Sequence, residues 1–146
     1  MPASANKVLP IYLNRHPETD YFPVDSPKTV WIGQRRDWRI RQLVAVQELE
    51  GKALSELSRL AEVTHDNIAQ PVALYHISDR LYIVYEYVDL DLFDLLPLSE
   101  WEASGVMKQV IGAFQYLKQN SISFLVDSIR LDADGVVKIS QYTFPK

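Results

Sequence analysis

The fold is decided by residues 68–88, which read IAQPVALYHISDRLYIVYEYV. Two apolar segments, 68–77 and 81–88, are rich in β-branched and aromatic residues, which favour strands. Only residues 78–80 separate them, which is the length of a short hairpin connection. Pro71 lacks a backbone N–H and weakens the central pairing of the first strand. The stretch therefore predicts two adjacent antiparallel strands.

A second pair of strands and one helix are predicted upstream of this hairpin. Residues 29–34 and 40–47 have strand character, and an arginine-rich tip lies between them. Within residues 52–63, leucine and alanine recur at helical spacing. The polar segment 64–67 is typical of a helix end, so one amphipathic helix follows the first pair of strands.

A short helix over 90–96, a long helix and a last hairpin are predicted downstream. The long helix begins at Ser99, because Ser99 and Glu102 have the spacing of a capping box. Asn120 suits a left-handed helix stop. Residues 128–131 and 136–140 read as a hairpin. The long helix carries one apolar stripe, made by Ala103, Val106, Met107, Val110, Ala113, Phe114 and Leu117.

Composition excludes several classes of function. The 146 residues correspond to one ordinary domain. A net charge of −4 argues against broad attraction to nucleic acid or anionic membranes. The charge is unevenly divided: residues 1–52 carry 8 Lys/Arg and 6 Asp/Glu, whereas residues 53–146 carry 7 Lys/Arg and 13 Asp/Glu. The absence of cysteine excludes disulfides, thiolate metal sites and a cysteine nucleophile. Without a recognisable targeting peptide or bilayer-spanning stretch, we expect a cytoplasmic or nuclear protein.

The order of the predicted elements resembles the first part of a protein kinase domain, and short motifs fall in the same order. Residues 44–47, VAVQ, resemble the kinase Val-Ala-Ile-Lys strand, and Glu56 occupies the position of the helix-C glutamate. Residues 65–68, HDNI, resemble His-Pro-Asn-Ile. Residues 81–88 resemble the strand that leads into the hinge, and 132–139 resemble the turn before Asp-Phe-Gly.

The resemblance implies an α+β fold: a kinase-like N-lobe, with an antiparallel sheet and one C-type helix, followed by a partial, truncated C-lobe with a long helix and a β-hairpin. The implied organisation is an N-terminal extension at 1–22 and a truncated kinase-like domain at 23–146. Within that domain, residues 23–88 are N-lobe-like and residues 89–146 form the partial C-lobe.

The sequence departs from the family where phosphoryl transfer needs positioned charge. Gln47 stands at the strand lysine, and counting back from Val30 puts Pro23, Asp25 and Lys28 at the three glycine positions. The catalytic and metal-binding motifs fall on uncharged residues, namely Phe124, Leu125, Val126, Ser128, Gln141, Tyr142 and Thr143. These departures predict a pseudokinase that is not an enzyme and holds no metal or cofactor.

A vestigial nucleotide pocket is implied by the same resemblance. It would be formed by Val30, Ala45, Glu56, Tyr85, Glu86 and Val88, with Tyr85 as the gatekeeper. Arg130 falls in the strand where kinases place the aliphatic residue beneath adenine. Its guanidinium either obstructs a nucleotide or points outward if the strand register is one residue different.

The leading hypothesis is a catalytically inactive scaffold or regulatory module that binds protein, either a second copy of itself or a larger partner. One candidate surface is the arginine-rich tip, which is otherwise a solvated loop: Arg35, Arg36, Trp38, Arg39 and Arg41. A second is the stripe of the long helix, expected to lack cover at Met107, Val110, Phe114 and Leu117. A third is the outward face of the helix that carries Glu56, through which the kinase resemblance implies regulation. The alternative hypothesis is a nucleotide-sensing module that binds ATP without transferring phosphate.

Overall fold

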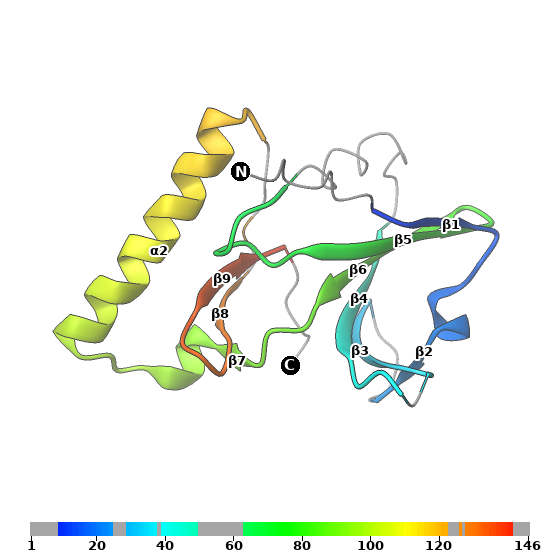
Figure 1. Cartoon of the computed structure of the whole chain (residues 1–146), viewed down its shortest axis with the longest axis horizontal. Helices are drawn as coiled ribbons and strands as arrows, with labels where there is room; N and C mark the ends of the chain where they lie inside the picture. Colours follow the sequence, from blue (N-terminus) through cyan, green and yellow to red (C-terminus); the bar gives the residue numbers. More distant parts are fainter. Residues whose placement is uncertain are drawn as a thin grey trace. The chain divides into compact units, whose positions relative to one another are not determined.

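The computed structural model describes residues 9–24, 29–37, 39–49, 63–122, 126 and 128–141. These residues form two compact units. The first lies within residues 1–63 and 70–87, and the second within 64–69 and 88–143. Each unit has its own sheet, and the long helix belongs to the second (Figure 1). The predicted α+β fold is confirmed.

The first unit is built on a six-stranded sheet of order β1-β5-β6-β4-β3-β2. Only β1 runs parallel to its neighbour, β5, and the other pairs are antiparallel. The pairing shifts between Pro71 and Ala73, as expected where proline cannot donate to the ladder. The strands are β1 (Ile11–Leu13), β2 (Tyr21–Pro23), β3 (Val30–Arg35), β4 (Leu43–Leu49), β5 (Pro71–Ile77) and β6 (Arg80–Glu86).

One face of this sheet carries a tightly packed aromatic core. Its buried members are Tyr21, Trp31, Val44, Val46, Ala73, Tyr75, Tyr82 and Val84. The segment before β2 covers part of this face, because Tyr12 stacks on Tyr75 at 4.8 Å and His16 lies edge-on to Tyr82 at 4.8 Å. A 3-10 helix, η1 (Pro17–Thr19), separates β1 from β2. Residues 11–23 therefore contribute two strands and a cover to the unit.

The second unit combines a three-stranded antiparallel sheet with the long helix. The sheet order is β7-β8-β9, with β7 (Leu90–Asp91), β8 (Ser128–Leu131) and β9 (Val137–Ser140). The predicted short helix is wrong in part, because Leu90 and Asp91 pair with β8 and only η3 (Leu92–Leu95) is helical. The Asp91 side chain accepts from the Phe93 N–H at 2.9 Å, so it caps η3 and ends the strand.

The long helix α2 (Glu100–Gln119) begins as the sequence predicts. Ser99 Oγ accepts from the Glu102 N–H, and Glu102 Oε1 accepts from the Ser99 N–H, both at 3.1 Å. This reciprocal capping box satisfies two donors of the first turn. At the other end the left-handed residue is Ser121, with φ 54°, whereas Asn120 has φ −96°. The predicted left-handed stop is therefore one residue early.

The apolar stripe of α2 divides between a buried face and an exposed one. Val106, Val110, Ala113 and Leu117 are buried, and the helix packs against β9. The expectation that Val110 and Leu117 lack cover is wrong, because the final hairpin supplies it. Met107 and Phe114 point away from this contact and stay half exposed. The predicted stripe was wider than the face that one sheet can cover.

Two predicted features lie outside the described residues. One is the helix at 52–63 that carries Glu56, and the other is Trp38 at the arginine-rich tip. The domain boundaries inferred from the resemblance stay predictions. Within the part of the chain that the structure describes, no helix has the length and apolar character needed to cross a membrane.

Gly33 offers a test of the packing in the first unit. A Cβ at this position would lie 2.9 Å from Trp31 Cζ3 and 3.1 Å from Tyr21 Cβ, which is too close. We expect Gly33→Ala to lower the free energy of unfolding by about 1–3 kcal/mol through overpacking. Urea unfolding followed by circular dichroism measures the change.

Gly105 supplies the matched control for this substitution. It lies inside α2, and a Cβ there would meet no atom within 4 Å. Gly105→Ala should raise stability by up to about 1 kcal/mol, because alanine favours the helix. Equal effects of the two substitutions would contradict the close packing around Gly33.

Candidate functional site

The implied nucleotide-facing residues of the first unit share one face of its sheet. Ala45 pairs with Tyr85 across β4 and β6, and Val30 pairs with Gln47 across β3 and β4. Because side chains alternate along a strand, these four lie on the face opposite Val44. Val30, Ala45 and Tyr85 are buried, and Gln47 is half-buried. The structure thus brings three of the implied pocket residues together.

The other implied pocket residues are placed differently. The Glu86 carboxylate accepts from the Gln70 N–H at 2.9 Å, within the first unit. Val88 is buried in the second unit, and Glu56 lies outside the described residues. The structure therefore does not assemble the full predicted set on one unit.

Three of the residues counted at the catalytic and metal-binding positions, Val126, Ser128 and Gln141, are described by the structure. Ser128 is buried in β8, where its Oγ lies 2.6 Å from Ser140 Oγ, and Gln141 follows β9. Val126 is half-buried between α2 and β8. The remaining positions, Phe124, Leu125, Tyr142 and Thr143, lie outside the described residues. In the described part of the chain no group of acidic or histidine side chains could hold a metal ion.

Arg130 is an interior residue of the second unit. Its side chain is 7% exposed, and Nε donates to the Val88 carbonyl at 2.7 Å. A guanidinium nitrogen lies 3.7 Å from the Asp91 carboxylate. The outward orientation allowed at the sequence level is therefore wrong, and Arg130 links β8 to the segment that precedes and forms β7.

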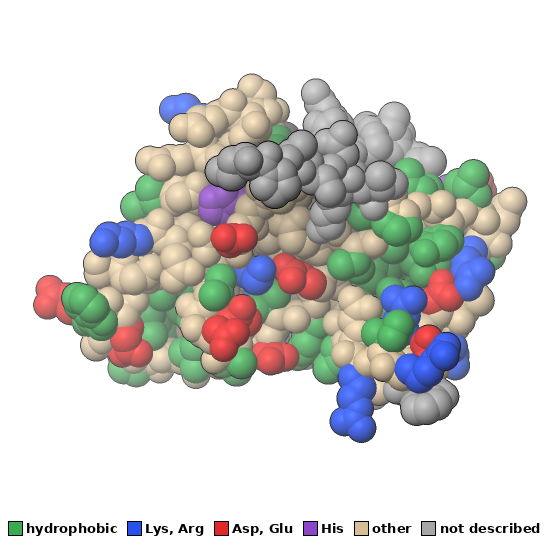
Figure 2. Space-filling view, viewed as in Figure 1, with side chains coloured by type: hydrophobic (Ala, Val, Ile, Leu, Met, Phe, Trp, Pro, Cys, Tyr) green, Lys and Arg blue, Asp and Glu red, His purple; other side chains and the backbone are tan. Residues whose placement is uncertain are grey.

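The arginine-rich tip is not a single patch. Arg36 donates to the Glu18 carbonyl at 2.7 Å, and Arg39 pairs with Asp37 at 3.1 Å. Arg41 is exposed, whereas Arg35 is half-buried and lines a pocket. On the face shown in Figure 2, Lys and Arg side chains gather over β1, β2 and β3, and Asp and Glu gather over β7, β8 and the start of α2. On this face, the positive side chains of the first unit and the negative side chains of the second follow the charge division seen in the sequence.

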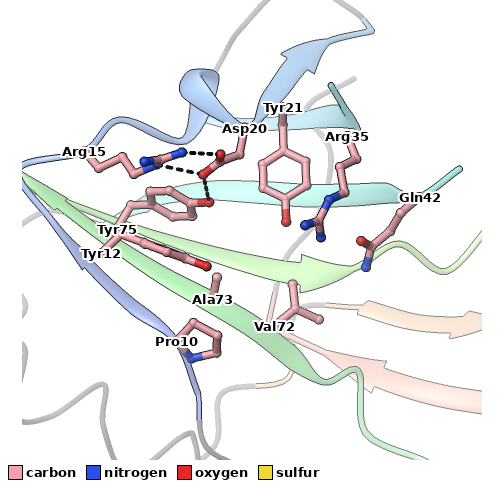
Figure 3. Close-up of a pocket in the computed structure, with 10 residues that line it drawn as sticks. All are labelled: Pro10, Tyr12, Arg15, Asp20, Tyr21, Arg35, Gln42, Val72, Ala73 and Tyr75. Atoms are coloured by element: carbon pink, nitrogen blue, oxygen red, sulfur yellow. Dashed lines mark hydrogen bonds and ion pairs between the residues drawn. The ribbon is translucent and has the colours of Figure 1, made fainter. Parts of the chain in front are cut away.

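A pocket of about 200 Å³ lies over the aromatic face of the first unit (Figure 3). No local motif marks it, because its walls come from segments far apart in the chain. Sequence reasoning identified only one of its residues as a candidate. The lining consists of Pro10, Tyr12, Arg15, Asp20, Tyr21, Arg35, Gln42, Val72, Ala73 and Tyr75.

Asp20 is the electrostatic centre of this pocket. Its carboxylate accepts two hydrogen bonds from the Arg15 guanidinium and one from the Tyr75 hydroxyl at 2.6 Å. The Arg15 bonds, followed by the Tyr75 bond, hold the pKa of Asp20 below its ordinary value. Burial, and then the same bond to Asp20, raises the pKa of Tyr75, so its phenol remains a donor at neutral pH.

The α+β fold, with a multi-stranded sheet and a long helix, is consistent with a kinase-like N-lobe and part of a C-lobe, and comparison with known proteins agrees. The protein kinase domain family matches residues 39–140. Serine/threonine-protein kinase pak-2 of Caenorhabditis elegans is 24% identical over 86% of this chain and 27% of its own length. Serine/threonine-protein kinase pakA of Dictyostelium discoideum is 22% identical over 92% of this chain and 13% of its own length. Human NUAK family SNF1-like kinase 2 is 30% identical over 60% of this chain and 15% of its own length.

The chain belongs to the protein kinase domain family. It spans about a quarter or less of the length of these relatives. The expectation that it is not an enzyme is contradicted, because relatives are named serine/threonine protein kinases. That expectation rested on Gln47 within the 44–47 motif and on the residue types counted at the glycine, catalytic and metal-binding positions.

The Asp20 cluster predicts a specific acid response. Because the pKa of Asp20 is lowered on folding, its contribution is fully present above the ordinary carboxyl pKa of about 4 and is lost as pH falls through the lower folded value. We expect Asp20→Asn to lower the melting temperature at pH 7 and to reduce its fall between about pH 4 and pH 2. Thermal melts over this pH range measure both effects.

Tyr75→Phe is the matched variant, since it removes one of the donors to Asp20 and keeps the ring. Its acid response should lie between those of the wild type and Asp20→Asn. A wild-type acid response in Asp20→Asn would contradict the assignment of this carboxylate.

Proposed function

We propose that this member of the protein kinase family acts by binding protein, and that the exposed face of α2 associates with a second copy of the chain. The observation that carries the proposal is the apolar centre of this face. Met107, Ile111 and Phe114 are 53%, 48% and 47% exposed and follow helical spacing. Single exposed apolar residues are ordinary, but three large ones in line are typical of an interaction surface.

The ends of the same face make it self-complementary. At 100° per residue, Glu100 and Lys118 fall on the line of Ile111, with Glu100 in the first turn and Lys118 in the last. An antiparallel second helix brings Glu100 of one copy opposite Lys118 of the other. Each α2 also has a macrodipole that favours this antiparallel arrangement. A two-fold contact of this kind uses the same residues twice.

The proposed association gives the chain a regulatory or scaffolding role, in which two members of the kinase family are held together. A contact made mainly by one helix per partner buries a small area, so we expect concentration-dependent pairing and not an obligate dimer. The buried face of α2 is already occupied by β9, so the exposed face is available without unfolding the second unit.

Ile111→Asp tests this proposal. The substitution puts a carboxylate from each copy close to the two-fold axis, where both would be desolvated. In size-exclusion chromatography with light scattering, we expect the wild type to approach a dimer mass as its concentration rises, and Ile111→Asp to remain a monomer.

Phe93→Asp is the matched control, because Phe93 is 79% exposed on η3 and lies outside the α2 face. It should associate like the wild type. A wild type that remains a monomer at every concentration, or an Ile111→Asp variant that still pairs, rules out this interface.

A second candidate function is nucleotide binding on the sheet face of Val30 and Ala45. The observation that favours it is the grouping of Val30, Ala45 and Tyr85 on one face, in a chain whose relatives are named kinases. In the kinase resemblance, Val30 and Ala45 would pack against adenine. Gln47 lies on the same face and would be the polar residue nearest to that position.

Thermal melts with ATP, with and without magnesium, test this second candidate. It predicts that ATP raises the melting temperature of the wild type. Gln47→Lys should enlarge the shift, because an ammonium group pairs with phosphate where an amide cannot. Gln119→Lys, at the exposed end of α2, adds the same charge elsewhere and should leave the shift unchanged. An unchanged melting temperature in every variant would exclude nucleotide binding.

A further inference from the structure

We propose that the pocket of the first unit, lined by Tyr12, Tyr21, Arg35 and Tyr75 among others, binds a carboxylate carried on an apolar body. An acidic peptide segment and a small aryl carboxylate share this chemistry. The pocket belongs to the first unit and lies on the face of its sheet opposite Val30, and the proposal does not depend on either proposed function.

The charge of the pocket is unbalanced. Its lining contains two arginines and one acid, Arg15, Arg35 and Asp20. Arg15 is neutralised, because its guanidinium donates twice to the Asp20 carboxylate. Among the described residues, none accepts a hydrogen bond from the Arg35 side chain or forms an ion pair with it. One positive charge is therefore left to attract an anion.

Polar groups converge beside this charge. Figure 3 shows the Tyr21 hydroxyl, the Arg35 guanidinium and the Gln42 side-chain amide gathered at one side of the pocket. Tyr21 is buried, and burial raises the pKa of its phenol, so the hydroxyl stays protonated at neutral pH. The guanidinium, the phenol and the amide NH₂ all donate. A carboxylate only accepts, and it fits the planar fork of arginine with two parallel bonds.

Another side of the pocket is apolar and suits the body of such a ligand. Tyr12 stacks on Tyr75, and Pro10, Val72 and Ala73 complete this side. The volume of about 200 Å³ would hold about six or seven water molecules, which is enough for a carboxylate and part of a ring. Tyr12 is 38% exposed, so the apolar side can be reached from solvent.

A monoanion fits better than a dianion. The Asp20 carboxylate lines the same pocket, and its negative charge opposes a second negative charge on the ligand. With Arg15 already committed to Asp20, Arg35 is the single guanidinium left to balance the ligand. A carboxylate is therefore favoured over a phosphate dianion, although both accept hydrogen bonds.

The test is a titration of the full chain, followed by ¹H–¹⁵N correlation spectra. The probes are 3-phenylpropionate, its neutral amide, phenyl phosphate and the dipeptide N-acetyl-Phe-Asp-amide. We expect 3-phenylpropionate to shift signals of β1, β2 and β5 in a saturable way, and the neutral amide to leave them in place. Tighter binding of the dipeptide points to a peptide as the natural source, and tighter binding of 3-phenylpropionate points to a small carboxylate.

Arg35→Gln should weaken binding of 3-phenylpropionate by roughly 10- to 100-fold, since a charged hydrogen-bond donor is lost. Arg39→Gln is the matched control, because Arg39 is exposed, pairs with Asp37 and does not line the pocket. It should bind as the wild type does. Tyr21→Phe keeps the buried ring and removes one hydrogen-bond donor, so it should also weaken binding of 3-phenylpropionate. It serves as the test variant if Arg35→Gln fails to fold.

Three results would overturn the proposal. The first is equal binding of 3-phenylpropionate and its neutral amide, which would leave an apolar pocket without anion recognition. The second is wild-type affinity in folded Arg35→Gln or, if that variant does not fold, in Tyr21→Phe. The third is tighter binding of phenyl phosphate than of 3-phenylpropionate, because it would contradict the preference for a monoanion.

Discussion

Side-chain alternation along β4 is the constraint on which the first unit depends. Val44 and Val46 are wholly buried on the aromatic face, and Ala45 is wholly buried on the other. A slip of one residue would exchange the two sets, because the side-chain period of a strand is two. The cross-strand pairs with β3 and β6 hold the register, so they also determine that Gln47 shares a face with Val30. The pocket on one face and the implied nucleotide-facing residues on the other both follow from this register.

In the second unit, the side-chain amide of Asn67 holds the helix and the hairpin in register. Asn67 donates both to Gln109 Oε1 on α2 and to the Val137 carbonyl on β9, each at 2.8 Å, and Gln109 Oε1 also accepts from the Val137 N–H. These bonds join the 65–68 motif to the helix and the hairpin. They hold the buried face of α2 against β9. The opposite face, which carries Met107, Ile111 and Phe114, stays exposed. The position of this motif in the family resemblance thus has a local physical explanation.

Sequence reasoning succeeded where the signal is local or periodic and failed where it depends on distant partners. The Ser99 capping box and the 68–88 hairpin need only neighbouring residues, and both are present. The two faces of the α2 stripe could not be separated, because periodicity identifies apolar positions and not the width of the covering sheet. Arg130 could not be oriented either, since its partner Val88 lies 42 residues away. The expectation that the chain is not an enzyme also failed, because the names of its relatives contradict it.

By itself, the sequence determined the alternation of apolar and polar residues, the helix cap and the order of elements that marks the kinase family. These properties follow from backbone geometry and hold wherever the chain is placed. Only the tertiary structure decided that Tyr12, Arg15 and Asp20 lie against Tyr75, more than 50 residues later, and that Arg35 enters the resulting pocket. Such a site depends on which strands become neighbours. That choice is made by burial over the whole sheet, so no short segment carries its signature.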